Sequence, residues 1–389
     1  MKIKNYIKFS LLFLAFGSIL PIVSDSSSVR YIRFICPLLI FLIALLFSIK
    51  RYDNSFNSIT KIYRSLLFIF IIVSFLTLFK NYAYLFYGFT YRNFVNIIFI
   101  ISPIICCYLI VKMLDISSVF KIIYFLFYLF MMMYAMELLV HGVTISSILT
   151  TLTGGSIINS DFDTESGSSL IFGFYSLFFL MNKNYYHFLI SLLLIILGAK
   201  RIAIAGVLIS VILYFLYPFV YKKWISKSKK TFLIITTFIL FLLAHFWTLI
   251  YTGVYDKEIH NLTGISPNAF FMGRLNRVSQ FFDVIKDSSN YFTGYGFGYV
   301  ENVLYYSMNL PTPFHNDFYR MFLEMGAIFF FSFIYILLKF AIKNRLAFSS
   351  LFLLLILMQT DNVLIYETVM YSFYIIFFSS IYYKTGNTN

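Results

Sequence analysis

Three neighbouring polar residues, His315, Asn316 and Asp317, begin an apolar segment in the sequence PTPFHNDFYRMFLEMGAIFFF, which covers residues 311–331. An imidazole at a water-accessible site has a pKa suited to accepting a proton near neutral pH, which makes His315 a candidate general base. Asn316 or Asp317 can instead cap the helix that the apolar segment predicts, and His315 would then be structural. Both interpretations stay open on these residues alone.

Four cations form a second group of candidates. Lys200 and Arg201 belong to GAKR, between two apolar segments. Arg274 and Arg277 belong to FFMGRLNRVSQFFDVI, whose apolar spacing predicts an amphipathic helix on a membrane surface, with both guanidinium groups on one face. Because guanidinium groups bind phosphate oxygens in pairs, these cations predict an anion site. The alternative for Lys200 and Arg201 is an anchor at lipid headgroups.

The remaining polar motifs predict less chemistry. GYGFG at residues 294–298 lacks the context of a dinucleotide fingerprint and is interpreted as a flexible turn. DFDTE at residues 161–165 contains a D-x-D pattern and is interpreted as a solvated acidic loop. Cys36, Cys106 and Cys107 lie in apolar segments, without the spacing of a metal site or a disulfide framework. The sequence therefore predicts no metal site and no cofactor.

The composition determines the class of protein. Of the 389 residues, 60% are hydrophobic and only 12% are charged, whereas about a quarter of the residues of an average soluble domain are charged. Apolar segments long enough to cross roughly 30 Å of hydrocarbon recur along the chain. We predict an all-α polytopic membrane protein with about twelve spans. These lie near residues 7–24, 31–49, 63–79, 94–114, 119–140, 167–182, 185–198, 202–221, 231–251, 318–338, 346–359 and 363–383.

Charge predicts the orientation of these spans. Lysine and arginine concentrate in alternate loops, including KKWISKSKK at residues 222–230, and the positive-inside rule then places both termini in the cytoplasm. The net charge of +14 is thus mostly a topology signal, and nucleic acid is excluded as a partner. The basic, apolar N-terminus is interpreted as an uncleaved first helix. We expect spans one to nine in residues 1–251, a large extracytoplasmic loop in 252–317, and spans ten to twelve with a cytoplasmic tail in 318–389.

The order of these features resembles the O-antigen ligase/polymerase superfamily of bacterial surface-glycan assembly. The resemblance covers roughly residues 185–340 and rests on an outer basic turn, a late outer loop with Gly-x-Gly, and then HNDFYRMFLEMGAIFFF. In the family pattern, His-Asn is followed by a hydrophobic helix with Glu and Gly, which here are Glu324 and Gly326. The resemblance implies a GT-C-like fold in the bacterial cytoplasmic (inner) membrane.

The resemblance also implies roles for individual residues. His315 matches the catalytic histidine, Arg201 matches a basic position after the seventh span, and Arg274 matches the loop arginine, with Arg277 as its rival. We also expect Arg277, Asn316, Tyr295 and Lys200 to bind substrate, although Lys200 has no match in the family pattern. Tyrosines of the outer loop either stack on sugar rings or belong to the aromatic belt at the membrane interface.

The implied substrate is an oligosaccharide linked to a polyprenyl diphosphate, among membrane lipids. A flippase and chain-length regulator proteins are further candidate partners. The favoured activity is a Wzy-type polymerase of O-antigen, capsular or exopolysaccharide repeat units, which transfers them with inversion and without a metal. The alternatives are an O-antigen ligase, which transfers the glycan to a terminal acceptor, and a flippase for lipid-linked oligosaccharides.

Overall fold

The computed structural model describes residues 3–24, 27–47, 54–83, 91–140, 142, 146, 169–198, 200–270, 278–281, 290–308 and 314–386. Within these residues the secondary structure is helical, without a β-strand. The elements are α1 (Ile3–Ser24), η1 (Ser27–Phe34), α2 (Ile35–Leu46), α3 (Asn54–Ala83), α4 (Tyr91–Met113), α5 (Ile116–Val140), α7 (Ser169–Met181), α8 (Tyr185–Leu197), α9 (Arg201–Val220), η2 (Tyr221–Ile225), α10 (Lys229–Tyr251), α11 (Asp256–Thr263), α12 (Pro267–Phe270), α14 (Tyr299–Asn302), η3 (Val303–Ser307), α15 (Asp317–Ala341), α16 (Arg345–Leu357), η4 (Val363–Ile365) and α17 (Glu367–Gly386).

The helices confirm a polytopic membrane protein. Among the described residues, seven helices are long and apolar enough to cross a membrane, namely α1, α3, α4, α5, α9 with η2, α10 and α15. Four shorter apolar helices occupy 31–46, 169–181, 185–197 and 345–357. A helix therefore lies at each predicted span, but the number twelve and the side on which each loop lies stay predictions.

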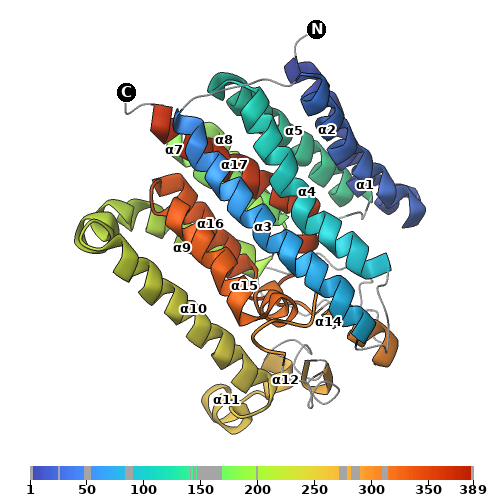
Figure 1. The fold of residues 1–389 in the computed structure, drawn as a ribbon, viewed down its shortest axis with the longest axis vertical. Helices are drawn as coiled ribbons and strands as arrows, with labels where there is room; N and C mark the ends of the chain where they lie inside the picture. The colour runs from blue at the N-terminus through green and yellow to red at the C-terminus, as the bar shows by residue number, and fades with distance from the viewer. Residues whose placement is uncertain are drawn as a thin grey trace.

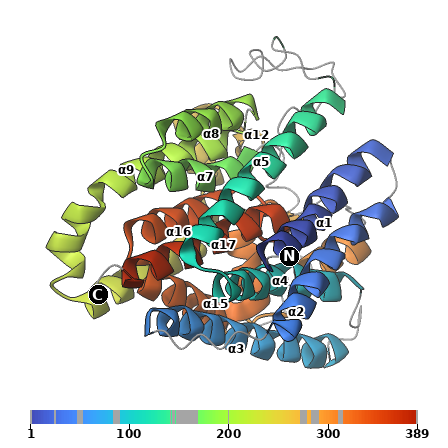
Figure 2. The ribbon, with the colours of Figure 1, turned by 90° about the horizontal axis from the view of Figure 1, so that it is seen from above.

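Helix α17 forms the centre of the bundle. Helices α3, α4, α5, α7 and α16 pack around it, and its residues from Val369 to Ile381 are buried. Both termini lie at one end of the bundle, while α11, α12 and α14 lie at the other end (Figure 1). Figure 2 shows α16 and α17 between the α1–α2 pair and α9. The predicted break near Gly198 is confirmed, because α8 ends at Leu197 and α9 begins at Arg201. Helix α8 packs along α7 and contacts α9 little.

Helix α15 is broken in its middle, although as a whole it is long and apolar enough to cross a membrane. Gly326 has a φ of 75° and a ψ of 164°, and this backbone conformation is not helical. The freed backbone groups pair with the preceding turn: Tyr295 N–H donates to Leu323 O (3.0 Å), and Ala327 N–H donates to Tyr291 O (2.7 Å). Non-helical backbone at membrane depth is tolerated only where protein or water satisfies it, and here the turn does so.

The GYGFG segment forms this turn. The sequence predicts a flexible turn here, whereas the structure shows a buried one. All five of its residues are buried. Gly294 and Gly326 approach so closely that a Cβ on Gly326 would lie 2.2 Å from the backbone nitrogen of Gly294. Helices α3 and α4 hold the far side, where Thr77 Oγ1 accepts the N–H of Phe297 (2.9 Å) and the Asn93 amide donates to Phe297 O (2.6 Å). Glycine is thus required at the crossing by contact as well as by φ.

The crossing gives a first testable prediction. Gly326→Ala is expected to destabilise the protein by about 3 kcal/mol or more, from strain of about 1–3 kcal/mol in a backbone region that is essentially restricted to glycine and from overpacking of about 1–3 kcal/mol. Gly264→Ala is the control for a positive φ without a close contact, because Gly264 has a φ of 68° but no atom within 4 Å of an added Cβ. The measurement is the thermal unfolding midpoint of each purified variant in detergent. Equal midpoints for the two variants would contradict the interlock.

Candidate active site

The cap of α15 is Asn316, one of the two capping candidates in the sequence, and the role of His315 stays a prediction. Its Oδ1 accepts the N–H of Tyr319 (3.0 Å), and its Nδ2 donates to the hydroxyl of Tyr251 on α10 (2.9 Å). Asn316 is completely buried, so its predicted contact with substrate has no exposed surface to support it. His315 is left outside the cap, is partly exposed, and has a φ of 57°. Left-handed backbone costs a non-glycine residue about 1–2 kcal/mol, so neighbouring groups must hold His315 in place.

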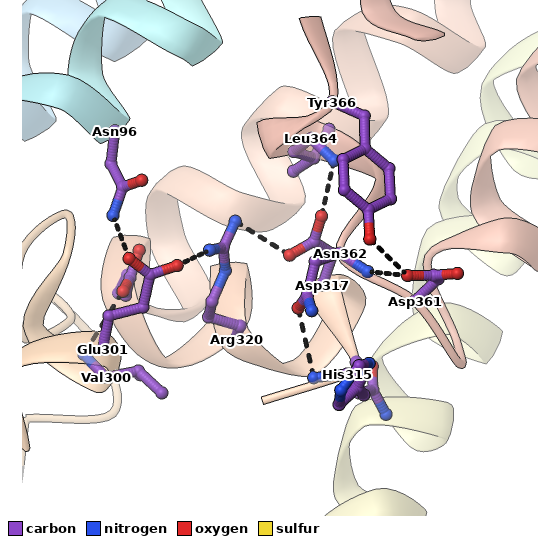
Figure 3. Close-up of polar contacts among 12 residues, drawn as sticks. Asn96, Val300, Glu301, His315, Asp317, Arg320, Asp361, Asn362, Leu364 and Tyr366 are labelled. Carbon is purple, nitrogen blue, oxygen red and sulfur yellow. Dashed lines mark hydrogen bonds and ion pairs between the residues drawn. The ribbon is translucent and has the colours of Figure 1, made fainter. Parts of the chain in front are cut away.

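The turn at residues 361–364, between α16 and α17, provides this support. Asn362 Oδ1 accepts the N–H of His315 (3.1 Å), and Asp361 O accepts the N–H of Asp317 (3.1 Å). In the opposite direction, the carboxylate of Asp317 accepts the N–H of Leu364. Figure 3 shows the contacts of His315 with Asn362 and of Asp317 with Leu364. Together the three contacts fix His315 and Asp317, on either side of the cap residue, against one short turn.

A buried ionic network surrounds Arg320, near the start of α15 and close in the chain to His315. Arg320 is 1% exposed, and its guanidinium contacts Asp317 Oδ1 and Glu301 Oε1, each at 2.8 Å. Glu301 in turn accepts a hydrogen bond from Asn96 of α4 (2.9 Å), as Figure 3 shows. One turn further along α15, Glu324 Oε1 accepts the N–H of Val300 (3.3 Å). A buried charge persists only when it is paired and hydrogen-bonded, and this network therefore joins the 290–308 segment to the helix that carries His315.

The structure separates Lys200 from Arg201. The ammonium group of Lys200 forms an ion pair with Asp361, the neighbour of Asn362, and is 12% exposed. Arg201, the first residue of α9, is exposed and makes no ion pair or hydrogen bond with the residues that the structure describes. Lys200 thus ties the start of α9 to the turn that holds His315. Arg201 keeps its guanidinium group available for an anion.

Of the other predicted site residues, one is buried and two lie outside the described residues. Tyr295 is only 4% exposed and stacks on Tyr299, with ring centroids 4.7 Å apart, which leaves little surface for a sugar ring. Arg274 and Arg277 lie outside the described residues, as does the DFDTE loop at 161–165. Within the described part of the chain, no group of three histidine, cysteine, aspartate or glutamate residues is arranged to hold a metal ion. His315 and Lys200 are the predicted residues that the 361–364 turn contacts, and Arg201 follows Lys200 in the chain.

Sequence reasoning missed Asp361, Asn362, Arg320 and Glu301. The signal for the first two was the polar pair itself, in a gap of only a few residues between the last two predicted spans. Arg320 carried a signal too, because a charge inside an apolar helix is expensive and usually paired. Its partner Glu301 could not be named, since the pairing depends on how the 290–308 segment folds back onto α15.

The comparison with protein families agrees with the resemblance that the sequence shows. Residues 187–334 match the family model described as O-antigen ligase, close to the region in which the sequence resembles that superfamily. The match contains the Lys200–Arg201 turn and His315, but not the 361–364 turn. No curated protein and no solved structure matches the chain. Members of this family are membrane glycosyltransferase-like enzymes that act on lipid-linked glycans. The match to an O-antigen ligase domain at residues 187–334 thus supports the resemblance of this chain to the O-antigen ligase/polymerase superfamily.

Proposed function

We propose that the protein polymerises oligosaccharide repeat units linked to polyprenyl diphosphate, at the outer face of the bacterial cytoplasmic membrane and with both termini in the cytoplasm. The observation that carries this proposal is the junction of two groups at one turn: Asn362 holds His315, and Asp361 holds Lys200 beside the exposed Arg201. A candidate base and a candidate anion-binding cation thereby lie on the two segments that meet at residues 361–364.

The chemistry that follows is a direct displacement. His315 takes the proton from a hydroxyl group of the acceptor sugar as that oxygen attacks the anomeric carbon of the donor sugar. The bond between this carbon and the diphosphate oxygen breaks, and the polyprenyl diphosphate leaves with the electron pair. Arg201, together with Arg274 or Arg277, stabilises the negative charge that develops on the leaving group. Attack opposite the leaving group inverts the anomeric configuration.

The polymerase and the ligase use the same donor and differ in the acceptor. The strong bias of this chain towards Phe, Tyr, Ile and Lys is typical of divergent surface-glycan gene clusters, which encode a polymerase, and it favours that activity. The ligase is the second candidate, because the matched family model is described as O-antigen ligase.

The surface-glycan ladder of a deletion strain on a gel tests the proposal. If the protein is the polymerase, the strain shows a single repeat unit on its acceptor, and the gene restores the ladder. If no glycan reaches the acceptor while lipid-linked polymer accumulates, the protein is a ligase. Purified protein in detergent provides a second test. It should elongate lipid-linked repeat units without a sealed membrane, whereas a flippase gives no product under these conditions.

Cationic stabilisation of the leaving group predicts that the reaction needs no added metal. Elongation by the purified protein should proceed at the same rate, within about twofold, in EDTA as in Mg²⁺, because guanidinium groups do the charge stabilisation that a metal would otherwise supply. The measurement is the initial rate over a range of EDTA concentrations, with a metal-dependent glycosyltransferase as the positive control. A loss of activity in EDTA that Mg²⁺ restores would contradict the metal-independent mechanism.

A further inference from the structure

We infer that Asn362 is a positioning residue, whose side-chain oxygen holds His315 in the left-handed conformation that the reaction uses. This inference rests on the proposed role of His315 as the general base. The two residues lie 47 positions apart in the chain and meet through one hydrogen bond, from His315 N–H to Asn362 Oδ1 (3.1 Å).

The orientation of the Asn362 amide follows from its partner. A backbone N–H can face only an acceptor, so the oxygen of the amide must point to His315 and the nitrogen must point elsewhere. In the described part of the chain, Asn362 Nδ2 finds no hydrogen-bond acceptor, although the residue is completely buried. The oxygen is therefore the half of this side chain that makes a contact. The same contact can be made by a carboxyl oxygen.

Asn362 is itself held firmly enough to act as a support. Its N–H donates to Asp361 Oδ1 (2.8 Å), which also accepts from the hydroxyl of Tyr366 (3.3 Å). The other carboxylate oxygen of Asp361 pairs with Lys200, and Asp361 O accepts the N–H of Asp317. Without the Asn362 oxygen, the His315 N–H would lose this acceptor while its backbone is in a strained conformation, and the imidazole would be held less firmly in place.

The test compares Asn362→Ala with Asn362→Asp in the purified elongation assay. Asn362→Ala removes the acceptor and should lower kcat by about 10- to 100-fold with little change in KM, as displacement of a catalytic group does. Asn362→Asp keeps an acceptor oxygen in place, because a completely buried carboxyl group beside Asp361 and Asp317 stays protonated and retains its carbonyl oxygen, and it should return kcat to within about threefold of wild type. If Asn362→Ala keeps wild-type kcat, the inference is wrong. It is equally wrong if both variants fold and are equally inactive.

Asn344 provides a matched control at the N-cap of α16. Its Oδ1 also accepts backbone N–H groups, from Leu346 and Ala347, and it is buried at a different helix start. Asn344→Ala removes the same kind of acceptor and should leave kcat per folded molecule unchanged. A fall in kcat equal to that of Asn362→Ala would show a general loss of stability and overturn the positioning role.

Hydrogen exchange of the His315 amide tests the contact in the wild-type protein, whether or not the variants fold. The amide should exchange slowly, because Asn362 Oδ1 binds it, and exchange at the rate of an unbonded amide would overturn the inference. Failure of the proposed function has a different signature. If His315→Asn retains full activity, the proposed base is wrong. If His315→Asn is inactive while Asn362→Ala is fully active, only the role of Asn362 is wrong.

Discussion

His315→Asn is expected to stop chain elongation while the protein accumulates normally in the membrane. Asparagine tolerates the left-handed conformation better than most residues, and His315 has a φ of 57°, so this substitution preserves the backbone and removes the base. Loss of a general base lowers the rate by about 10²- to 10⁴-fold. In the deletion strain, the variant should therefore leave a single repeat unit on the acceptor.

A companion variant separates catalysis from backbone strain. His315→Ala removes the base and also places a residue with less tolerance for positive φ at this position, so it should be as inactive as His315→Asn but less stable. His260→Ala is the control, since His260 is an exposed histidine of α11 in the same predicted loop, residues 252–317. Ladders are compared at matched membrane abundance. A normal ladder from His315→Asn would make His315 a structural residue and end the proposed mechanism.

Arg201→Ala should lower the elongation rate by about 10²- to 10³-fold, the usual effect of removing one preorganised group that stabilises developing charge. The thermal midpoint should stay unchanged, because Arg201 is exposed and contacts no described residue through a hydrogen bond or ion pair. Arg201→Lys should restore only part of the rate, since an ammonium group cannot bind two phosphate oxygens as a guanidinium fork does. Initial rates with purified protein and lipid-linked donor give the comparison.

Lys200, the neighbour of Arg201, should instead affect the stability of the protein. Lys200→Ala leaves the buried Asp361 carboxylate without its cation, and breaking a buried pair costs about 3–5 kcal/mol. We therefore expect Lys200→Ala to lower the unfolding midpoint strongly. Lys257→Ala, at an exposed cation of α11, should change neither rate nor midpoint. If Arg201→Ala matches Lys257→Ala in rate, Arg201 does not bind the diphosphate.

The sequence by itself determined the class of protein, the position of its helices and the break at Gly198. These features depend on the local density of apolar side chains, which must match the thickness of the hydrocarbon, and on residues close in the chain. His315 and Arg201 could also be identified as candidates from the sequence, because an imidazole or a guanidinium group has its chemical properties wherever it lies in the fold. Hydropathy could not show the break in α15, since the helix as a whole is long and apolar enough to cross a membrane.

Only the tertiary structure decided how these candidates are held. Asn316 and Asp317 are both good caps by type, and the hydrogen bond to Tyr319 assigns the cap to Asn316. Lys200 and Arg201 are adjacent cations, and they differ because Asp361 pairs with one of them. Asn362 reaches His315 across 47 residues of chain. Contacts of this kind depend on which helix ends meet in space, and no periodicity along the sequence records that meeting.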